Sequence, residues 1–212
     1  MPLENFILLG LGCLAGISLF TIIRRQKSEV APSAAQDLAD LLAQKRTNKG
    51  IDLASLSRLS PVLVVFLRHA GCTFCRQAVC DVAQSKRKLE EAGVRVVFVH
   101  FGNAEASETL FRMNGIVSPE TIYDDDQQLY RAFGLRRGTL SEVASPRVIW
   151  RGIRAGLIDG HGIGRPEGDV LQLPGVFLLD DCTIARSFRH KSAADRPDYL
   201  AIALPQSTGS ME

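Results

Sequence analysis

The strongest constraint on the fold is a pair of cysteines placed between two regular elements. An apolar run, Val62–Leu67, leads into Cys72-Thr73-Phe74-Cys75, and the segment from Thr73 to Ala92 has helical character. A continuous apolar run rich in branched side chains predicts a buried strand. Backbone N–H groups and the positive end of the dipole at a helix N-terminus favour the thiolate, which is the nucleophilic form of cysteine. The sequence therefore predicts a reactive thiol pair where a strand passes into a helix.

Length and composition exclude several classes of protein. A chain of 212 residues is long enough for one well-cored domain plus a tail. The net charge of +2 and the lack of a basic tract interleaved with aromatics argue against a nucleic-acid-binding protein. The chain has five cysteines, of which one pair has a meaningful spacing. This usage favours a reducing compartment and a catalytic pair over a framework of structural disulfides.

The N-terminal region is predicted to be a separate membrane anchor. Residues 6–23 carry no charge and are long enough to cross most of a hydrocarbon layer of about 30 Å. The basic residues Arg24, Arg25 and Lys27 follow this run, which does not match the basic n-region of a signal peptide. A signal peptide and a buried helix remain as alternatives, and Cys13 is interpreted as a small apolar residue of the run. By the positive-inside rule, the domain that follows is expected on the cytosolic face.

The rest of the chain is expected to form one domain with an entry segment and a tail. We predict an anchor over 1–25, a linker and docking helix over 26–57, the main domain over 58–205 and a disordered tail over 206–212. In the main domain, strands are predicted at 62–67, 94–99, near Ile122, at 176–180 and at 183–188, and helices at 73–92, 105–113, 128–133 and 198–204. This order matches the thioredoxin-like fold, an α/β fold with a central mixed sheet flanked by helices. Ligand chemistry in such sheets lies at the carboxyl ends of the strands, where the cysteine pair falls.

The resemblance to thioredoxin-like proteins extends to Leu173-Pro174-Gly175, which precedes the strand at 176–180. In those proteins, the strand opposite the cysteine pair follows a cis-proline that touches the redox centre. The resemblance therefore implies a cis bond at Pro174.

The chain also resembles a narrower group, the peroxiredoxin-like branch of the alkyl hydroperoxide reductase/thiol-specific antioxidant family. The similarity covers about residues 50 to 200, and its matching segments are 68–75, 94–99, 168–172, 174–177, 189–191 and 195–197. It implies a thiol-disulfide oxidoreductase and antioxidant that reduces peroxides or disulfides. The expected electron donor is a thioredoxin- or glutathione-like protein or thiol, and no bound cofactor is expected. Lipid endoperoxide reduction is a close alternative, and a non-catalytic redox sensor or scaffold is an alternative of a different class.

Two orders of attack remain open for the cysteine pair. Cys72 is first at the helix N-terminus and is favoured as the attacking thiolate, with Cys75 as the resolving thiol. An alignment of Cys75 with the peroxidatic cysteine of peroxiredoxins reverses the order, so that Cys75 becomes a sulfenic acid and Cys72 condenses with it. Two packed thiols without chemistry, or a metal site completed by His69 and Cys80, are the less favoured interpretations.

Four residues next to the cysteines in the sequence are considered for a role in stabilising or positioning the thiolate. Arg68 and Arg76 flank it and would stabilise a thiolate if their guanidinium groups lean inward, although each also fits a solvated surface charge. Thr73 is interpreted as a helix cap, with donation to a sulfur as the alternative. His69 is expected to be a turn residue rather than a proton shuttle.

For three more residues the sequence indicates a location but no role in the chemistry. Cys80 is expected to face the core, Cys182 falls in a hairpin turn without an assigned role, and Gln172 lies either in the same cleft or at a strand edge.

The stretch between Gly134 and Pro174 has an excess of arginine over acidic residues. Such an excess suits the steering of an anionic substrate or contact with anionic lipid, while a solvated helix face is the simpler interpretation. The glycines at 160–168 do not lie between a strand and a helix, so nucleotide binding is not expected.

Overall fold

The computed structural model describes residues 32–162, 164 and 168–204. Its contacts divide the chain into two units, residues 1–37 and 38–212, and the sheet with the covering helical residues from Leu38 onward belongs to the second. The predicted anchor at 6–23 and the predicted tail at 206–212 lie outside the described residues. Within the described part, no helix is both long enough and apolar enough to cross a membrane.

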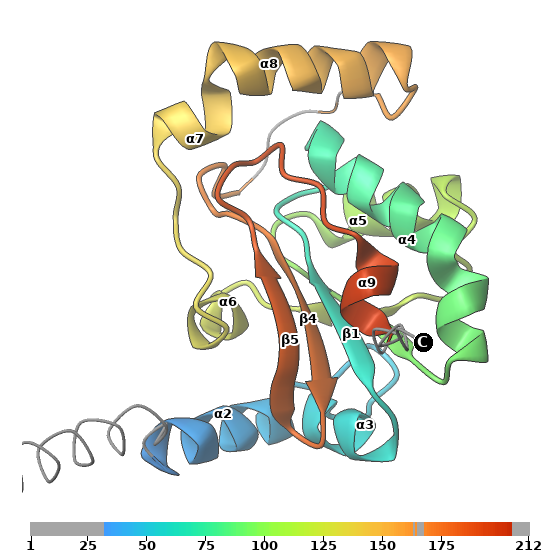
Figure 1. The fold of residues 1–212 in the computed structure, drawn as a ribbon, viewed down its shortest axis with the longest axis vertical. Helices are drawn as coiled ribbons and strands as arrows, with labels where there is room; N and C mark the ends of the chain where they lie inside the picture. Colours follow the sequence, from blue (N-terminus) through green and yellow to red (C-terminus); the bar gives the residue numbers. More distant parts are fainter. Residues whose placement is uncertain (1–31, 163, 165–167, 205–212) are drawn as a thin grey trace, which may run out of the picture. The chain divides into compact units, whose positions relative to one another are not determined.

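A five-stranded mixed sheet forms the centre of the second unit (Figure 1). The strand order is β3-β2-β1-β4-β5, with β1, β2 and β3 parallel and the β4–β5 hairpin antiparallel to β1. The strands are β1 (Val62–Phe66), β2 (Arg95–His100), β3 (Glu120–Tyr123), β4 (Gly175–Asp180) and β5 (Thr183–Arg189). All five strands predicted from the sequence are confirmed, and the fold is the expected thioredoxin-like one.

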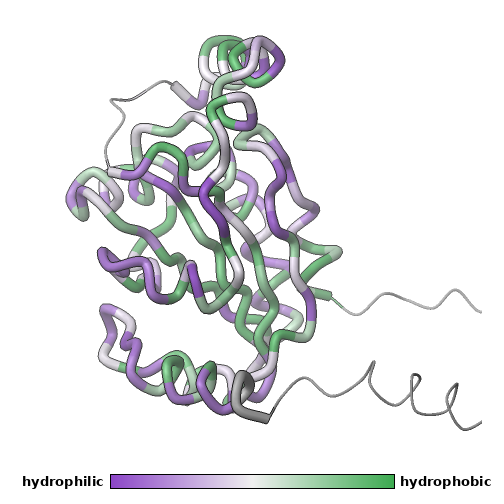
Figure 2. The backbone as a smooth tube through the Cα atoms, turned by 90° about the vertical axis from the view of Figure 1, so that its left-hand side faces the viewer, coloured by the Kyte–Doolittle hydropathy of each residue, from purple (hydrophilic) through white to green (hydrophobic). Residues whose placement is uncertain are grey.

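Strand β1 is apolar throughout because both of its faces are covered. Leu63 and Val65 point into one hydrophobic cluster, whereas Val64 and Phe66 point into another on the opposite face. Alternate residues of a strand face opposite sides of the sheet, so a strand between two layers needs apolar residues at every position. The hydrophobic stretches accordingly run through the middle of the domain, as Figure 2 shows.

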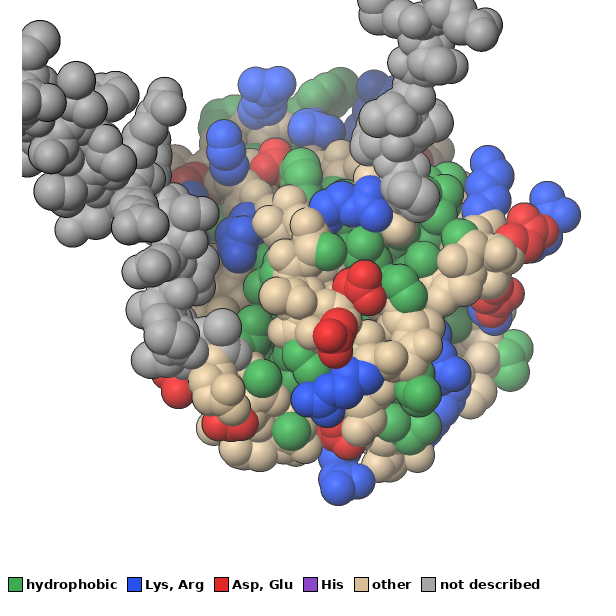
Figure 3. Space-filling view, turned by 60° about the horizontal axis from the view of Figure 1, so that its bottom comes forward, with side chains coloured by type: hydrophobic (Ala, Val, Ile, Leu, Met, Phe, Trp, Pro, Cys, Tyr) green, Lys and Arg blue, Asp and Glu red, His purple; other side chains and the backbone are tan. Residues whose placement is uncertain are grey.

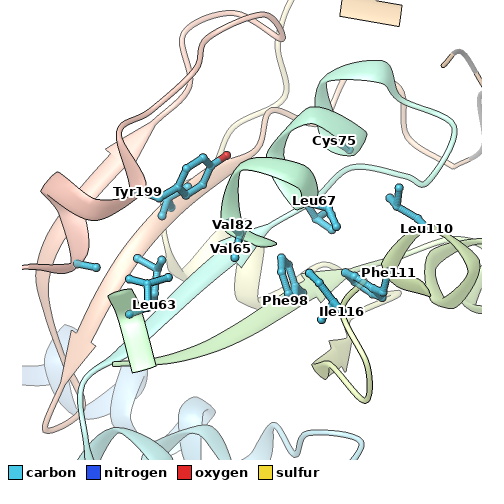
Figure 4. Close-up of a cluster of buried hydrophobic side chains, with 14 of the residues drawn as sticks. Leu63, Val65, Leu67, Cys75, Val82, Phe98, Leu110, Phe111, Ile116 and Tyr199 are labelled. Carbon is cyan, nitrogen blue, oxygen red and sulfur yellow. The ribbon is translucent and has the colours of Figure 1, made fainter. Parts of the chain in front are cut away.

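Helices cover both faces of the sheet. Helices α4 (Thr73–Glu91), α5 (Ala104–Met113) and α9 (Tyr199–Ala203) contribute to the cluster drawn in Figure 4. The other cluster takes residues from α2 (Pro32–Gln44), α3 (Leu53–Leu59) and α6 (Gln128–Ala132). The predicted docking segment is thus helical, and its Leu53 and Leu56 are fully buried.

Helix α4 carries the cysteine pair at its N-terminus and anchors it through an apolar stripe. Cys75, Val79, Val82 and Leu89 are its buried apolar residues, at the spacing of one helix face. The helix ends before Gly93, which adopts a left-handed conformation with φ of 71°. A rigid helix packed along its length holds the first turn in a fixed position above the sheet.

The stretch between Gly134 and Pro174 folds into a short helical layer, which agrees with a helix face as the simpler interpretation of its arginines, although the sequence did not predict the bounds of the helices. It contains α7 (Leu140–Ala144), α8 (Pro146–Ile153) and a π-helical turn, η2 (Arg154–Ile158). Ser145 caps α8 by accepting a hydrogen bond from the Val148 N–H, and Pro146 occupies the first turn, where its missing N–H costs nothing. The layer lies across the end of the sheet at which β1 feeds α4 (Figure 1), and η2 contacts α4.

Candidate functional site

The predicted placement of the cysteine pair is confirmed. Cys72 is the N-cap residue of α4, and its carbonyl accepts the first helical hydrogen bond, from the Arg76 N–H at 3.0 Å. Cys75 lies in the first turn and points toward the hydrophobic cluster beneath the helix (Figure 4). Both side chains are buried, with exposed fractions of 6% for Cys72 and 2% for Cys75. All cysteines among the described residues are free thiols in this structure.

Arg68 binds both sulfurs, with different parts of the residue. Its guanidinium Nη2 donates to Cys72 Sγ at 2.9 Å, whereas its backbone N–H donates to Cys75 Sγ at 3.2 Å. A third bond, from Nη1 to the Val170 carbonyl at 2.6 Å, holds the guanidinium in place. The positive charge of Arg68 is therefore applied directly to Cys72.

The two thiols have opposite acidities. The Cys75 thiol donates to Cys72, and the positive charge of Arg68 also favours the anion, so the pKa of Cys72 lies well below its ordinary value. The pKa of Cys75 lies well above its ordinary value, because its proton is held by Cys72, its side chain is desolvated and the neighbouring thiolate repels a second negative charge. Of the two thiols, Cys72 is accordingly the one that the site favours in the ionised form.

The burial of Arg68 supports the same assignment. The residue is 5% exposed, and no carboxylate pairs with it in the described part of the chain. A buried charge is strongly unfavourable unless an opposite charge compensates it. Cys72 Sγ is the group that the structure places against this guanidinium, and a negative charge on Cys72 raises the pKa of Arg68 against the opposing effect of desolvation.

A small cavity of about 20 Å³ opens beside the sulfurs. That volume is room for about one water molecule. Its lining includes Arg68, Cys72, Cys75, Pro174, His190 and Tyr199. The site therefore admits a group of one or two oxygen atoms next to the thiolate, but nothing larger without movement of the surrounding chain.

The segment after η2 lies against the start of α4. The Thr73 hydroxyl donates to the Gly162 carbonyl at 3.1 Å, and the Gly164 N–H donates to the Gly71 carbonyl at 3.0 Å. The interpretation of Thr73 as the helix cap is wrong, because Cys72 occupies the cap position. The hydroxyl does not bond to a sulfur either; it ties the helix N-terminus to the covering segment.

Arg76 has a different role from Arg68. Its Nε donates to the Ala70 carbonyl at 2.9 Å, and no hydrogen bond joins its guanidinium to either sulfur among the described residues. Of the two interpretations left open for each arginine, contact with a thiol therefore holds for Arg68 and not for Arg76. Arg76 lies one turn along α4, where its side chain reaches back and braces the loop before Cys72.

Pro174 lies beside the cysteine pair, as the resemblance implies, but its peptide bond is trans. It lines the same small cavity as the two cysteines. No peptide bond in the described residues is cis, so the cis geometry implied by the family resemblance is wrong for this chain. The trans isomer is the one that most X–Pro bonds prefer, and here the preceding Leu173 N–H is satisfied by the Arg136 carbonyl at 3.1 Å.

The structure also tests the expectations for His69, Gln172 and Cys80. His69 is buried, and its carbonyl accepts a hydrogen bond from the Cys72 N–H at 3.1 Å, as a turn residue would. Gln172 is buried away from the cavity lining and donates to the Leu173 carbonyl at 3.0 Å. Cys80 is half-buried rather than in the core.

The structure adds His190 and Tyr199 to the site. His190 follows β5, and burial lowers its pKa to about 4, so it is neutral at pH 7. Burial also raises the pKa of Tyr199, which α9 brings over the cavity. One signal in the sequence could have found His190, since 189–191 is a segment of family resemblance, but nothing in the spacing shows that these residues lie near residue 72.

The described residues contain no cluster of three or more His, Cys, Asp or Glu side chains arranged to hold a metal ion. The metal set considered from the sequence is therefore not assembled in that part of the chain. The chemistry available at the site is that of two free thiols, of which Cys72 is the more acidic, beside a fixed positive charge.

Comparison with known proteins identifies the family. A family model described as AhpC/TSA antioxidant enzyme matches residues 81–192, which is more than half of the chain and begins just after the cysteine pair. A prostamide/prostaglandin F synthase of Danio rerio is 27% identical over 164 residues, covering 75% of this chain and 80% of the relative. The human peroxiredoxin-like 2C is 27% identical over 163 residues, covering 68% of this chain and 72% of the relative.

Among solved structures, the fold is similar to that of a cysteine-to-serine mutant of the peroxiredoxin 6 of Arenicola marina. The TM-score is 0.52 at 14% sequence identity, with 75% of this chain and 66% of that chain covered. At this identity the likeness concerns the fold.

Proposed function

Because the chain belongs to the AhpC/TSA antioxidant enzyme family and is a peroxiredoxin-like thiol oxidoreductase, we propose that Cys72 and Cys75 are its redox pair and that it reduces hydroperoxides. In this proposal Cys72 is the attacking thiolate and Cys75 the resolving thiol. The observation that carries the assignment is the 2.9 Å contact between Arg68 Nη2 and Cys72 Sγ.

The first step is attack of the Cys72 thiolate on one oxygen of the peroxide. An S–O bond forms and the O–O bond breaks, so that Cys72 becomes a sulfenic acid and the other oxygen leaves as an alkoxide, which takes up a proton to give the alcohol. Arg68 lines the cavity, and its buried Nε–H has no hydrogen-bond partner within the described residues. A fixed donor and positive charge at this point stabilise the negative charge that develops on the leaving oxygen.

The second step closes a disulfide. The Cys75 sulfur attacks the sulfenic sulfur of Cys72, an S–S bond forms, and the S–O bond breaks with release of water once the Cys75 proton has moved to the leaving oxygen. The sum is two thiols and one hydroperoxide converted into one disulfide, one alcohol and one water. A thioredoxin- or glutathione-like thiol donor then reduces the disulfide, so the cycle requires no bound cofactor.

The site geometry favours a peroxide over a protein disulfide as the oxidant. The cavity beside the sulfurs has a volume of about 20 Å³, and both sulfurs are buried. A peroxide group fits this space, whereas the disulfide of a folded protein would have to displace the Thr73–Gly162 and Gly71–Gly164 contacts. The raised pKa of Cys75 likewise argues against the reversed order, in which Cys75 meets the peroxide first.

Reduction of a lipid endoperoxide is the second candidate. The relative from Danio rerio is a prostamide/prostaglandin F synthase. Cleavage of a cyclic O–O bond by the same thiolate consumes the same two electrons and gives two hydroxyl groups on one product. A lipid endoperoxide is bulky, so this activity requires the covering segment to move.

Peroxide-dependent consumption of reduced thioredoxin tests the proposal. We expect turnover in the wild-type protein, none in Cys72→Ser and none beyond the first oxidation in Cys75→Ser. The control is Cys80→Ser, which alters a half-buried cysteine of the same helix and should keep full activity. The contrary result is reversible oxidation of the pair without turnover, tested with both hydroperoxides and endoperoxides as substrates and with both thioredoxin and glutathione as donors. That result would identify a redox sensor and contradict the proposal.

Location is a separate part of the proposal. The uncharged run at 6–23 and the basic residues after it support a single-pass anchor with the redox domain on the cytosolic face. In sealed vesicles, the redox domain should be cleaved by protease added from the cytosolic side, and alkaline washing should leave the protein in the membrane fraction. Release by alkaline washing would contradict an anchor.

A further inference from the structure

The outer surface of α8 and η2 exposes large apolar side chains. Trp150 is 64% exposed, Leu157 is 71% exposed and Ile158 is 70% exposed, and Ile149 and Ile153 are exposed beside them. A soluble protein rarely leaves so many large apolar groups together on one short element, and such patches mark interaction surfaces.

This exposure is not a consequence of loose packing. The inner side of the same segment is closely packed, since Val148, Ala155 and Gly156 are buried. Gly152 also faces Phe74 of the cysteine motif, since a Cβ at this glycine would lie 3.6 Å from the Phe74 ring. The segment thus has one side fixed to the domain and another side that is apolar and open.

Arginines flank the apolar surface. Arg147, Arg151 and Arg154 are exposed, and none forms an ion pair within the described residues. Asp159 is the acidic residue at the end of this segment. The other two described arginines of this stretch differ, because Arg136 pairs with Glu142 and Arg137 with Asp169. The unpaired arginines leave a net positive charge next to the apolar side chains.

The opposite end of the domain has a different character. On the face seen in Figure 3, acidic and basic side chains are interspersed among the apolar ones. The chain's single tryptophan lies in α8, so α8–η2 is where an indole lies beside exposed aliphatic side chains and unpaired guanidinium groups.

We propose that this α8–η2 surface binds an anionic lipid bilayer, with its apolar side chains in the boundary between headgroups and acyl chains. A surface helix with Trp and aliphatic residues on one side and Arg on another lies in the plane of a membrane interface. Indole rings favour that boundary, and long arginine side chains keep their charge among the headgroups while their stems lie along apolar material. The proposal goes beyond the proposed function and does not depend on it.

Binding in this orientation would place the redox centre next to the bilayer. The inner side of α8–η2 contacts Phe74, which lies between Cys72 and Cys75, and the Gly162 carbonyl just after η2 accepts the Thr73 hydroxyl bond. A hydroperoxide carried by a membrane lipid would thus meet the enzyme on the side where its thiols lie.

The chain provides its own probe, since Trp150 is its single tryptophan. The full-length protein is mixed with vesicles of phosphatidylcholine and phosphatidylserine, or of phosphatidylcholine alone, and tryptophan emission is recorded. We expect a shift to shorter wavelength and quenching by acyl-brominated lipid with the anionic vesicles. Each arginine near an anionic surface contributes about a fivefold factor in binding, so the triple variant Arg147→Gln/Arg151→Gln/Arg154→Gln should bind roughly 100-fold more weakly through this surface.

A matched pair of variants tests the apolar part. Ile149→Ser/Leu157→Ser should lose the emission shift, whereas Leu59→Ser/Val117→Ser should keep it, since Leu59 and Val117 are at least as exposed but lie outside α8–η2. Anchoring through residues 6–23 alone would sediment the protein with vesicles without changing Trp150 emission, and that result would overturn the proposal. A shift that appears without lipid as protein concentration rises would overturn it too, because the surface would then bind a second copy of the chain.

Discussion

The guanidinium of Arg68 lies 2.9 Å from Cys72 Sγ, while the backbone N–H of the same residue binds Cys75 Sγ. Cys72 therefore accepts a hydrogen bond from the charged guanidinium, whereas Cys75 accepts one from a neutral backbone N–H. The contact differs from a surface ion pair because Arg68 is buried and no carboxylate in the described chain pairs with it. The hydrogen bond from Cys75 to Cys72 is the main cause of the difference in acidity between the two thiols, and the Arg68 charge lowers the pKa of Cys72 further.

Removal of the Arg68 charge should weaken the nucleophile. In Arg68→Met the pKa of Cys72 should rise by about 1 to 3, because an opposite charge at this distance favours the ionised form by that amount. At neutral pH the rate of Cys72 alkylation should fall on the order of 10-fold or more, since the thiolate is the reactive species. The pH dependence of iodoacetamide labelling, followed by mass spectrometry of each cysteine, measures both quantities.

Arg76→Met is the matched control for this experiment. Its guanidinium donates a hydrogen bond to the Ala70 carbonyl and makes none to a sulfur within the described chain. The pH dependence of Cys72 alkylation should therefore stay close to that of the wild-type protein. Equal effects of the two substitutions would show that general charge near the helix, rather than the Arg68 contact, sets the acidity.

Two buried histidines should make the folded state sensitive to mild acid. Burial lowers the pKa of His100 and of His190 to about 4, whereas an unfolded histidine titrates near pH 6.5. Between these values the unfolded chain binds protons that the folded chain does not, so the free energy of unfolding falls as pH drops through this window. The loss is on the order of 3 kcal/mol for each histidine by about pH 4.

Urea denaturation at several pH values in this window measures the effect. His100→Leu keeps an apolar side chain against Phe111 and removes one titrating group, so the dependence on pH should fall by about half. An unchanged dependence in His100→Leu would mean that other groups cause the loss of stability.

The close approach of Gly164 to Gly71 should control access to Cys72. A Cβ at residue 164 would lie 2.7 Å from the Gly71 Cα, too close for the present backbone, so Gly164→Ala should separate the two segments and break their hydrogen bond. The rate of Cys72 labelling by a bulky maleimide should then rise several-fold relative to labelling by iodoacetamide. Gly152→Ala is the control, because its Cβ would meet Phe74 at an ordinary 3.6 Å; an equal rise in both variants would contradict the steric argument.

The elements that the sequence predicted are those whose signal is local. Val62–Phe66 is apolar at every position because both faces of β1 are covered, and this pattern is visible without any partner. Helix α4 is likewise indicated by a stripe of apolar residues and ends before Gly93, a residue suited to the left-handed conformation it adopts.

The roles of the site residues were harder to assign because they depend on contacts with residues that are far away in the sequence. The sequence shows that Arg68 is charged, but its burial and aim depend on the Val170 carbonyl, 102 residues away. The role of Thr73 likewise depends on the distant Gly162, whose carbonyl accepts its hydroxyl bond. His190 and Tyr199 reach the cavity only because the last strand and helix bring them there. At Pro174 the two isomers differ by only about 0.5–1 kcal/mol, so a family resemblance could not settle the geometry of one bond.

The decisive measurement identifies the sulfur that peroxide oxidises. Cys72→Ser and Cys75→Ser proteins are each treated with a single equivalent of hydroperoxide in the presence of a dimedone-type probe, and the labelled cysteine is located by mass spectrometry. Because the pKa of Cys72 is lowered and that of Cys75 is raised, we expect rapid sulfenic-acid labelling of Cys72 in Cys75→Ser and little labelling of Cys75 in Cys72→Ser. Rapid labelling of Cys75 in Cys72→Ser, with Cys72 unlabelled in Cys75→Ser, would show that Cys75 is the attacking residue and that the Arg68 contact does not select the nucleophile.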